Sequence, residues 1–525
     1  MKKKCLALIT IVLLLVTPIM AMAAETNNSS SSAFKSYTFD YYGKTVHCPA
    51  PYTLEQRVTG KDLGIPDFEI ANDIFVTPKG TVFVAVSGQD ETSNAVYQLD
   101  ENLKLEKSWL GYTDDKGEFV KFQKPTGVFV TPKDEVYIAD SGSKNIIQLN
   151  TDFTQVRIIP PPKVEDSAIL SENIGFIEKY TPGHLVVNDA GRIHVVAQNV
   201  NEGIVVFDPD GKFNGFMAAG KVHASAMDIF WRKFSNEAML KRMNAFVPVE
   251  YSNIMIDDRG FIYATSASKD VDTVIGEIKS GKGTEESSLV RRLNTNGTDI
   301  LRRKGYVPVV GDADILDLQL VKGDDQSGIS RIVDIACGPN GSFTLLDSKR
   351  NHMFTYNSEG YLLYAFSGPD VSVGGTDTPV SIAQYNDKIF LLDTATSSIS
   401  LYEKTEFAKL LDQAAYCEDN GEYTKAAEYW EKVLDANANY DLAYNGLGKK
   451  AYSDKDYKAA MFYYKNSNNR DGYSKAYKQY RNQVSAKYII PIAVIVIVIA
   501  TLVAAIFAVF KYMRKRREKR GGSRE

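Results

Sequence analysis

Short apolar segments alternate with turns along most of the chain, and one unit recurs six times. Each unit has an apolar strand, a turn and a second apolar strand, and most continue into a third strand such as "NIIQLN". The turns combine Pro, Gly, Asp and Asn, which supply the fixed or positive φ of a tight hairpin. The units, about 50 to 80 residues apart, are "DIFVTPKGTVFVAV" from 73, "GVFVTPKDEVYIAD" from 127, "HLVVNDAGRIHVVA" from 184, "NIMIDDRGFIYATS" from 253, "DIACGPNGSFTLLD" from 334 and "SIAQYNDKIFLLD" from 381.

A single unit of this kind cannot bury both faces of its sheet. Radial repetition around an axis solves this problem and leaves only short strand edges exposed, as in β-propellers. Six units therefore predict a mainly β fold, a six-bladed β-propeller over residues 36–403. The strand-like segment "SYTFDYYGKTV", residues 36–46, precedes the first unit. We expect it to supply the outer strand of blade six and so to close the ring.

The second unit resembles a known repeat. The segment "PTGVFVTPKDEVYIADSGSKNI", residues 125–146, is similar to the NHL repeat in its Pro and Gly, its alternating apolar strand and its apolar-Tyr-apolar-Ala-Asp end. The first unit matches next best, whereas units three to six keep the apolar pattern and lose much of the signature. The resemblance covers about residues 36–403 and implies a six-bladed propeller. NHL propellers serve as binding platforms and, less often, as enzymes.

Two segments depart from the strand pattern. Residues 222–246 have helical periodicity, and we interpret them as a helical insertion between blades three and four. Its apolar stripe is expected to pack on the propeller, and a role in gripping a ligand is the alternative. Residues 269–285 are rich in Gly, Lys and Ser and predict a loop.

The apolar period becomes helical in residues 404–487. Small and large residues recur 34 positions apart, which resembles the tetratricopeptide repeat. The first repeat departs from the family at Ala414, where the family has Gly, and neither repeat ends in the expected Pro. Such repeats usually bind peptides or partner helices, and a rigid spacer is the alternative. The resemblance assigns packing positions to Leu410, Ala426, Trp430, Tyr444, Leu447, Gly448, Ala460 and Tyr464.

The amino-terminal end has the pattern of an exported protein. Residues 1–23 combine a basic start, a short apolar run and small residues, so we predict a secretory signal peptide that is cleaved between Ala23 and Ala24. A membrane anchor that is kept is the alternative. Residues 24–35 predict a disordered linker.

The carboxy-terminal end has the pattern of a membrane anchor. Residues 488–510 are almost entirely apolar, and about 20 apolar residues span a bilayer core, so they predict one transmembrane helix. A buried helix is the alternative. The tail of residues 511–525 holds eight Lys and Arg, and the positive-inside rule keeps such a tail in the cytoplasm. We therefore expect a single-pass protein of the cell membrane whose N-terminal domain is extracellular.

The net charge narrows the choice of partner. The formal charge is −4, and without the three signal lysines and the tail, whose net charge is +6, the chain carries −13. An acidic domain is a poor nucleic-acid binder, because phosphate contacts need Lys and Arg. We expect a protein partner, such as another membrane protein, with a small-molecule ligand as the alternative. Three cysteines follow the signal, and this odd, sparse set is no disulfide framework.

Polar residues recur at two positions that would face one end of the propeller channel. The residues that open the inner strands are Asp73, Gly127, His184, Asn253, Asp334 and Ser381. The residues that end the second strands are Val86, Asp140, Ala197, Ser266, Asp347 and Asp393. Our candidate binding residues at the channel mouth are Asp73, His184, Asn253, Asp334, Asp140, Asp347 and Asp393.

These candidate residues allow two interpretations. Gluconolactonase-type six-bladed propellers hold a divalent ion with Glu, Asn and Asp, and oxygen-rich sets suit Ca²⁺ or Mg²⁺. The interpretation that we prefer is structural, because an Asp that ends a strand can accept backbone N–H bonds from the next loop. The ring also lacks a clear Glu. We therefore predict no catalytic residue, no metal ligand and no cofactor.

Three functions fit these observations. The first, which we prefer, is a membrane-anchored extracellular binding or scaffold protein whose propeller engages a ligand or partner and whose helical repeats mediate assembly. The second is a metal-dependent lactonase or lyase that uses Asp73, His184, Asn253 and Asp334. The third is a receptor, which would need a membrane partner because a 15-residue tail has no room for a signalling domain.

Overall fold

A computed structural model describes residues 36–68, 70–88, 93–163, 179–198, 200, 203–218, 251–266, 288–312, 329–369 and 374–521. The predicted signal peptide, the linker of residues 24–35, the helical insertion and the loop of residues 269–285 lie outside the described residues. The chain forms two compact units, one that ends at Lys409 and one that begins at Leu410.

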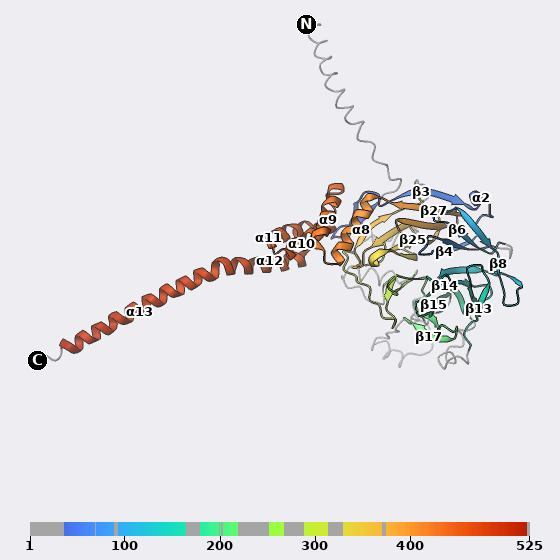
Figure 1. Ribbon diagram of the computed structural model, residues 1–525. Coiled ribbons are helices and arrows are strands. Elements are labelled where there is room, and N and C mark those ends of the chain that lie inside the picture. Colours follow the sequence, from blue (N-terminus) through green and yellow to red (C-terminus); the bar gives the residue numbers. More distant parts are fainter. Residues whose placement is uncertain are drawn as a thin grey trace, which may run out of the picture. The chain divides into compact units, whose positions relative to one another are not determined.

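The first unit is a six-bladed β-propeller built from antiparallel sheets (Figure 1). Blade one contains β4 (Ile70–Val76), β5 (Val82–Ser87), β6 (Ala95–Leu99) and β7 (Leu105–Trp109), and blade two contains β10 (Pro125–Val130), β11 (Val136–Asp140), β12 (Asn145–Leu149) and β13 (Gln155–Ile159). Blade three contains β14 (Thr181–Val187), β15 (Ile193–Gln198), β16 (Ile204–Phe207) and β17 (Phe213–Met217), and the described strands of blade four are β18 (Asn253–Ile256), β19 (Ile262–Thr265) and β20 (Val290–Leu293).

Blades five and six complete the ring. Blade five contains β21 (Ile332–Cys337), β22 (Phe343–Asp347), β23 (His352–Tyr356) and β24 (Leu362–Phe366), and blade six contains β25 (Pro379–Tyr385), β26 (Lys388–Asp393), β27 (Ser398–Lys404) and β3 (Tyr52–Thr59). The remaining short elements are β1 (Tyr37–Phe39), β2 (Thr45–His47), α2 (Gly60–Leu63), β8 (Gly111–Thr113), β9 (Phe119–Lys121) and η2 (Pro339–Gly341).

The innermost strands surround the channel axis. They pack against one another in the order β4, β10, β14, β18, β21 and β25, and β25 packs against β4 again. The second strands, such as β5 and β11, are buried along their whole length, which explains why their sequences are unbroken apolar runs. The hairpin turns have the predicted chemistry, since Gly80 has a φ of 86° and Gly260 a φ of 79°. The structure thus confirms the six-bladed prediction.

The strand that closes the ring is not the predicted one. The prediction that residues 36–46 complete blade six is wrong, because β3 pairs with β27 there, from Ser398 opposite Thr59 to Lys404 opposite Tyr52. Residues 36–46 turn back on themselves as the hairpin β1–β2, and β1 pairs with β24 of blade five. β3 is long enough to match all of β27, whereas β1 and β2 are three residues each.

Side chains reinforce the seam between β3 and β27. Arg57 Nε donates a hydrogen bond of 2.9 Å to Ser400 Oγ. The Lys404 side chain is only 2% exposed, and its ammonium lies 3.7 Å from Asp387 Oδ1 and 5.9 Å from the ring centre of Tyr52. A buried ammonium needs such partners, because desolvation of an unpaired charge is costly.

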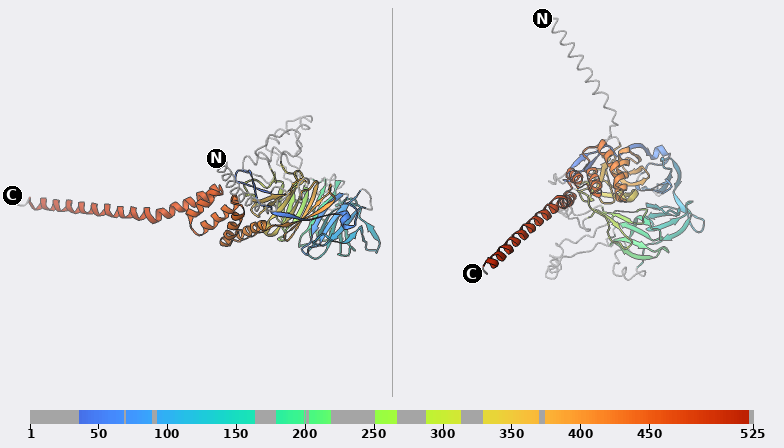
Figure 2. Two further views of the ribbon diagram at one scale, coloured as in Figure 1. Left: turned by 90° about the horizontal axis from the view of Figure 1, so that it is seen from above. Right: turned by 60° about the vertical axis from the view of Figure 1, so that its left-hand side comes forward.

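The second unit is a stack of short helices that leads into one long helix (Figure 2). The helices are α8 (Glu406–Asp419), α9 (Tyr423–Ala436), α10 (Asp441–Ser453), α11 (Tyr457–Asn466) and α12 (Arg470–Val484), and α9 to α12 each pack on the next. Of the predicted packing residues, Leu410 and Tyr444 are half-buried. The others are buried: Ala426, Trp430, Leu447, Gly448, Ala460 and Tyr464.

Close packing in this unit depends on residues that lack a large side chain. A Cβ at Gly446 would lie 2.1 Å from Trp430 Nε1, and a Cβ at Gly448 would lie 2.6 Å from the Tyr464 ring. The Trp430 indole also donates a hydrogen bond of 3.1 Å to Glu418 Oε2. Large rings therefore fit against glycine positions on α10.

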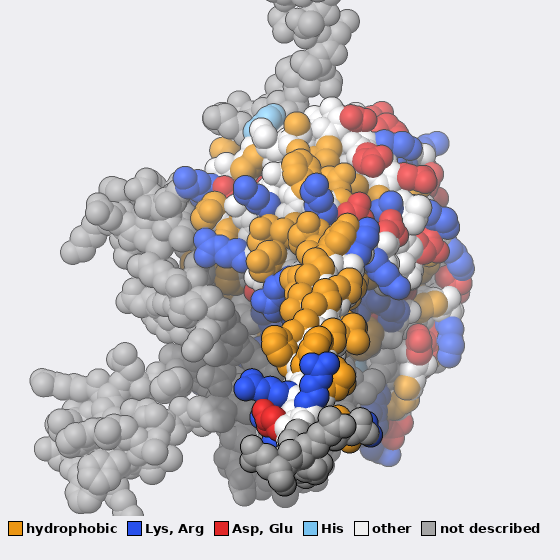
Figure 3. All heavy atoms as spheres, turned by 90° about the vertical axis from the view of Figure 1, so that its left-hand side faces the viewer, with side chains coloured by type: hydrophobic (Ala, Val, Ile, Leu, Met, Phe, Trp, Pro, Cys, Tyr) orange, Lys and Arg blue, Asp and Glu red, His pale blue; other side chains and the backbone are white. Residues whose placement is uncertain are grey.

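A long helix follows α12 without a break. The π-helical turn η3 (Ser485–Ile489) joins α12 to α13 (Ile490–Gly521), so that one helix runs from Arg470 to Gly521. Its apolar side chains are exposed on the surface and are followed by Lys and Arg (Figure 3). It is the one helix in the described part of the chain that is long and apolar enough to cross a membrane.

Candidate functional site

The predicted ring of polar residues lies where irregularities interrupt the inner strands. In five blades the register between the first and second strands shifts immediately before the ring residue. A β-bulge at such a place re-aims the side chain that follows it. The shifts fall between Ala71 and Asp73, Pro125 and Gly127, Pro182 and His184, Ile332 and Asp334, and Pro379 and Ser381.

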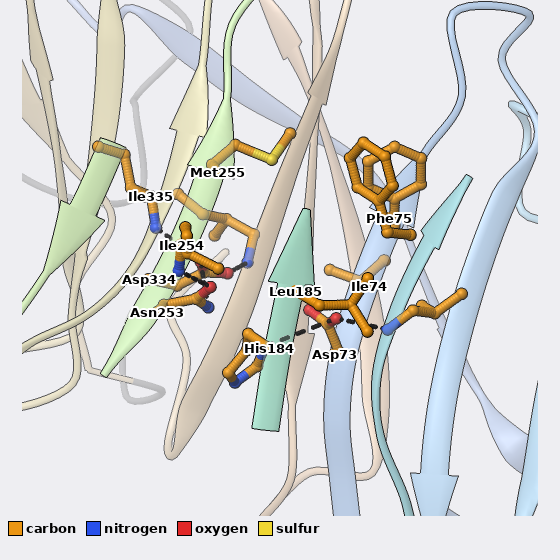
Figure 4. Close-up of a pocket in the computed structure, with 13 residues that line it drawn as sticks. Asp73, Ile74, Phe75, His184, Leu185, Asn253, Ile254, Met255, Asp334 and Ile335 are labelled. Atoms are coloured by element: carbon orange, nitrogen blue, oxygen red, sulfur yellow. Dashed lines mark hydrogen bonds and ion pairs between the residues drawn. The ribbon is translucent and has the colours of Figure 1, made fainter. Parts of the chain in front are cut away.

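Blade two leaves a gap in this ring, and His184 faces Asp73 across it. Gly127 has no room for a side chain, because a Cβ there would lie 2.3 Å from Gly183 O. The imidazole of His184 therefore faces the carboxylate of Asp73, with Nδ1 and Oδ2 3.6 Å apart (Figure 4). This distance is longer than a hydrogen bond and suits an ion pair with a protonated imidazole.

Asp73 connects three blades. Its Oδ2 accepts a hydrogen bond of 2.9 Å from the backbone N–H of Val128, in blade two. Its Oδ1 lies 3.2 Å from the hydroxyl of Ser381, in blade six, and shares the single proton of that hydroxyl with the closer Asp334. The Ser381 hydroxyl in turn accepts a hydrogen bond of 3.2 Å from the backbone N–H of Ile74. The inner edges of the first strands thus find partners in side chains of the neighbouring blade.

Asp334 is the most heavily bonded member of the ring. Its Oδ1 accepts hydrogen bonds of 2.6 Å from Asn253 Nδ2, in blade four, and from the N–H of Ile335. Its Oδ2 accepts hydrogen bonds of 2.6 Å from the Ser381 hydroxyl and from the N–H of Ile382, both in blade six. One buried carboxyl group therefore joins blades four, five and six.

The two acidic side chains and His184 influence one another's protonation. Burial, and then the charge of Asp73, raise the pKa of Asp334 to about 7. Burial acts to lower the pKa of His184, but the charge of Asp73 beside it and that of Asp334 raise it above its ordinary value. Near neutral pH Asp334 therefore binds a proton more readily than an ordinary aspartate, and His184 binds one more readily than an ordinary histidine.

A pocket opens beside the ring. Its empty volume is about 330 Å³, which includes open solvent at its mouth. Asp73, His184, Asn253 and Asp334 supply its polar lining. The apolar walls come from the positions one and two residues after each ring residue: Ile74, Phe75, Val128, Phe129, Leu185, Ile254, Met255, Ile335 and Ile382. Sequence analysis missed these walls, although their spacing from the ring residues is constant.

The three other candidate residues, Asp140, Asp347 and Asp393, are fully buried and do not line this pocket. Each accepts backbone N–H groups from the segment before its own blade and from the turn that follows it. Asp140 accepts from Lys124 at 2.8 Å and from Gly142 at 3.1 Å. Asp347 and Asp393 repeat this arrangement. These contacts are the structural role that strand-ending aspartates were expected to have.

Within the described ranges, no group of three or more His, Cys, Asp or Glu side chains is placed to hold a metal ion. The acceptor atoms of Asp73 and Asp334 instead receive N–H and O–H groups of the protein.

Fold and site together define a six-bladed β-propeller with a polar ring at its channel. Neither a protein-family model nor a curated protein matches the chain. Among solved structures, virginiamycin B lyase from Staphylococcus aureus has a TM-score of 0.38 at 10% identity and covers 67% of this chain and 100% of its own. The PQQ-bound aldose sugar dehydrogenase from Streptomyces coelicolor has a TM-score of 0.36 at 11% identity and covers 67% of this chain and 97% of its own. These similarities are too low to carry a conclusion about activity.

Proposed function

We propose that the chain is a membrane-anchored binding or scaffold protein. The propeller, outside the cell, engages a ligand or protein partner, and the helical unit mediates assembly at the membrane. The observation that supports a membrane anchor is the long apolar helix, because none of its most apolar part is buried in the protein. Exposed apolar surface of this extent is unfavourable in water and is removed from water by a bilayer.

The outward orientation rests on the charges that flank this helix. The tail after Phe510 holds eight Lys and Arg within 15 residues, which favours a cytoplasmic tail. With one crossing, the propeller then faces outward. The same proposal includes NHL-type blades and tetratricopeptide-type helix pairs, supported by the burial of Trp430 and Tyr464 against small residues.

The state of the polar ring favours binding over catalysis. The carboxyl oxygens of Asp73 and Asp334 accept hydrogen bonds from backbone N–H groups and from Ser381. The ring therefore connects the blades. A catalytic carboxylate must instead present a free oxygen to the substrate.

One observation favours an enzyme as the second candidate. Asp334 and His184 both have a raised pKa and lie in one pocket, and perturbed acids and bases cluster at catalytic sites. The corresponding function is a propeller lactonase or lyase, which in the gluconolactonase type uses a divalent ion.

His184 separates the two candidates, because its imidazole Nδ1 has no hydrogen-bond partner among the described residues and faces Asp73 at 3.6 Å. His184→Ala should therefore leave the propeller folded. In the binding-protein proposal, calorimetry with Ca²⁺ and Mg²⁺ gives no saturable heat for either the full-length protein or the variant. Stoichiometric metal binding that is lost in His184→Ala would replace the proposal by the enzyme.

The orientation has its own test. Protease added to intact cells should degrade the propeller and leave the tail, detected by a tag after Glu525. A propeller protected in intact cells and cleaved only after lysis would contradict the outward orientation.

A further inference from the structure

The helix α12 carries cations on the side that is turned away from the helical stack. Lys475, Lys478 and Arg481 are exposed and recur every three residues, whereas Ala476 is buried against α11. Lys487 follows in η3. Together with Tyr488, these four cations are called the juxtamembrane face below.

These cations have no carboxylate partner. No Asp or Glu of the described chain lies within ion-pair distance of Lys475, Lys478, Arg481 or Lys487. Other lysines of the unit are paired, such as Lys425 with Glu422 and Lys450 with Asp454, both at 2.8 Å. The cations of the juxtamembrane face therefore present uncompensated charge.

The acidic groups at the end of the helical stack where α12 ends do not neutralise the positive charge of the juxtamembrane face. Successive helices reverse direction, so the turns before α9 and before α11 lie at the same end of the stack as the end of α12. Glu422 and Asp454, in or beside these turns, have lysine partners. Asp456 accepts a hydrogen bond of 3.0 Å from Ala459 N as the cap of α11.

The juxtamembrane face is also at a fixed distance from the apolar segment, because α12, η3 and α13 form one helix. At about 1.5 Å per residue, Lys487 lies about 3 Å, Arg481 about 12 Å and Lys475 about 21 Å along the axis from Ile489. A headgroup layer is about 5–8 Å thick in each leaflet. Lys and Arg side chains also extend toward the interface.

An aromatic residue marks the same level. Tyr488 is 54% exposed and directly precedes the apolar run, and Tyr512 is 66% exposed directly after it. Tyrosines are enriched at both membrane–water interfaces, where the ring lies among headgroups. The two tyrosines thus bracket the apolar segment at the levels expected for the two interfaces.

We propose that the membrane-proximal part of the juxtamembrane face, Arg481 and Lys487, binds the phosphate groups of anionic phospholipids in the leaflet next to the helical unit. This inference depends on the membrane anchoring proposed above. Lys487 and Arg481 make the contacts, Lys478 lies at the limit of the screened field, and Lys475 lies beyond it, since the screening length is about 8 Å in physiological salt. The helical unit is thereby held upright over a patch of anionic lipid.

The experiment measures lysine acetylation by a water-soluble reagent, residue by residue, by mass spectrometry. The full-length protein is placed in nanodiscs of phosphatidylcholine alone or with one-third phosphatidylglycerol. We expect acetylation of Lys487 to be about fivefold slower with the anionic lipid, that of Lys478 to slow less, and that of Lys475 to be unchanged. High salt should abolish the difference.

A variant of the carboxy-terminal tail tests which leaflet contains the bound lipids. Arg516→Gln with Arg517→Gln removes charge on the other side of the apolar segment and should leave the slowing at Lys487 intact. Loss of the slowing in this variant, equal rates in both lipids, or equal slowing at Lys475 and Lys487 would each overturn the inference while leaving the anchoring in place. A protein that fails to migrate with nanodiscs would overturn the anchoring as well.

Discussion

Acid should destabilise the propeller through one buried histidine. His194, in β15, is only 5% exposed, and within the described residues neither of its ring nitrogens has a hydrogen-bond partner. Burial, and then the charge of Arg192, lower the pKa of His194 to about 4. The imidazole is therefore neutral in the folded protein at physiological pH. In acid it becomes protonated, and a protonated imidazole favours the unfolded chain, where water solvates its charge.

The sign and size of the effect follow from proton linkage. An unfolded histidine has a pKa of about 6.5, so between about pH 6.5 and pH 4 the unfolded chain binds more protons than the folded one. The contribution of the neutral His194 to the free energy of unfolding is present in full above about pH 6.5. It is lost as the pH falls from there to about 4. The interval corresponds to about 3 kcal/mol, most of which is lost at pH 4.5.

His194→Phe removes the titrating group and keeps a flat ring. Blades one and two have Phe83 and Tyr137 at the equivalent position, so an aromatic ring suits this layer of a blade. We expect the wild type to lose about 2 to 3 kcal/mol more of its free energy of unfolding than the variant between pH 7.5 and pH 4.5. Unfolding in urea is monitored by hydrogen exchange of peptides from β15. This measurement reports on the propeller separately from the helical unit.

His47→Gln is the matched control, because His47 is an exposed histidine of the same unit. This variant should follow the pH dependence of the wild type. If the wild type and His194→Phe instead lost stability in parallel, the explanation of acid sensitivity by a buried neutral His194 would be refuted.

Three further predictions concern the closure, the ring and the helical unit. Deletion of residues 52–59 should leave the outer edge of β27 unpaired and give an aggregated, protease-sensitive propeller, whereas deletion of residues 36–47 should leave a protease-resistant one. Asp334→Ala should lower the free energy of unfolding of the propeller in urea by about 3 kcal/mol, because four donors lose their acceptor. Gly446→Ala should destabilise the helical unit by about 2 kcal/mol, measured by the fluorescence of Trp430 in urea, because the added Cβ would overlap the indole.

Each of these predictions has an opposite outcome. A stable, monomeric propeller without residues 52–59 would show that β3 does not close the ring. An Asp334→Ala protein with unchanged stability would show that water replaces the carboxyl group without cost. Ser474→Ala, at an exposed position of α12, serves as the neutral control for Gly446→Ala, and equal stability of the two would exclude the packing argument.

The blades and the ring could be found in the sequence because their signals are local. A strand, a turn and a second strand lie within about fifteen residues, so one apolar pattern with one positive-φ turn encodes each hairpin. The ring residues could be named because each opens an inner strand. Asp73, His184, Asn253 and Asp334 do lie together in one pocket.

The errors concern information that is not local. The choice of β3 over residues 36–46 depends on pairing with a strand about 350 residues away, and strand propensity alone favours both segments. The roles of the aspartates depend on the bulge that turns Asp73 toward the channel, while Asp140 stays under its loop. The sequence pattern separates an aspartate that opens a strand from one that ends a strand, but it does not show which of them lines the pocket.

The seam between β3 and β27 also sets an order of events for the nascent chain. Apart from the short pair of β1 with β24, every other described strand pair of the propeller forms between neighbours in sequence, but this one joins residues 52–59 to residues 398–404. Closing so long a loop is entropically costly, and non-local pairing slows folding. The first blades can form early. The strand β3, which precedes them in the chain, stays unpaired until β27 has been made. We therefore expect β3 to be open to aggregation until the carboxy-terminal strand of the propeller has been synthesised.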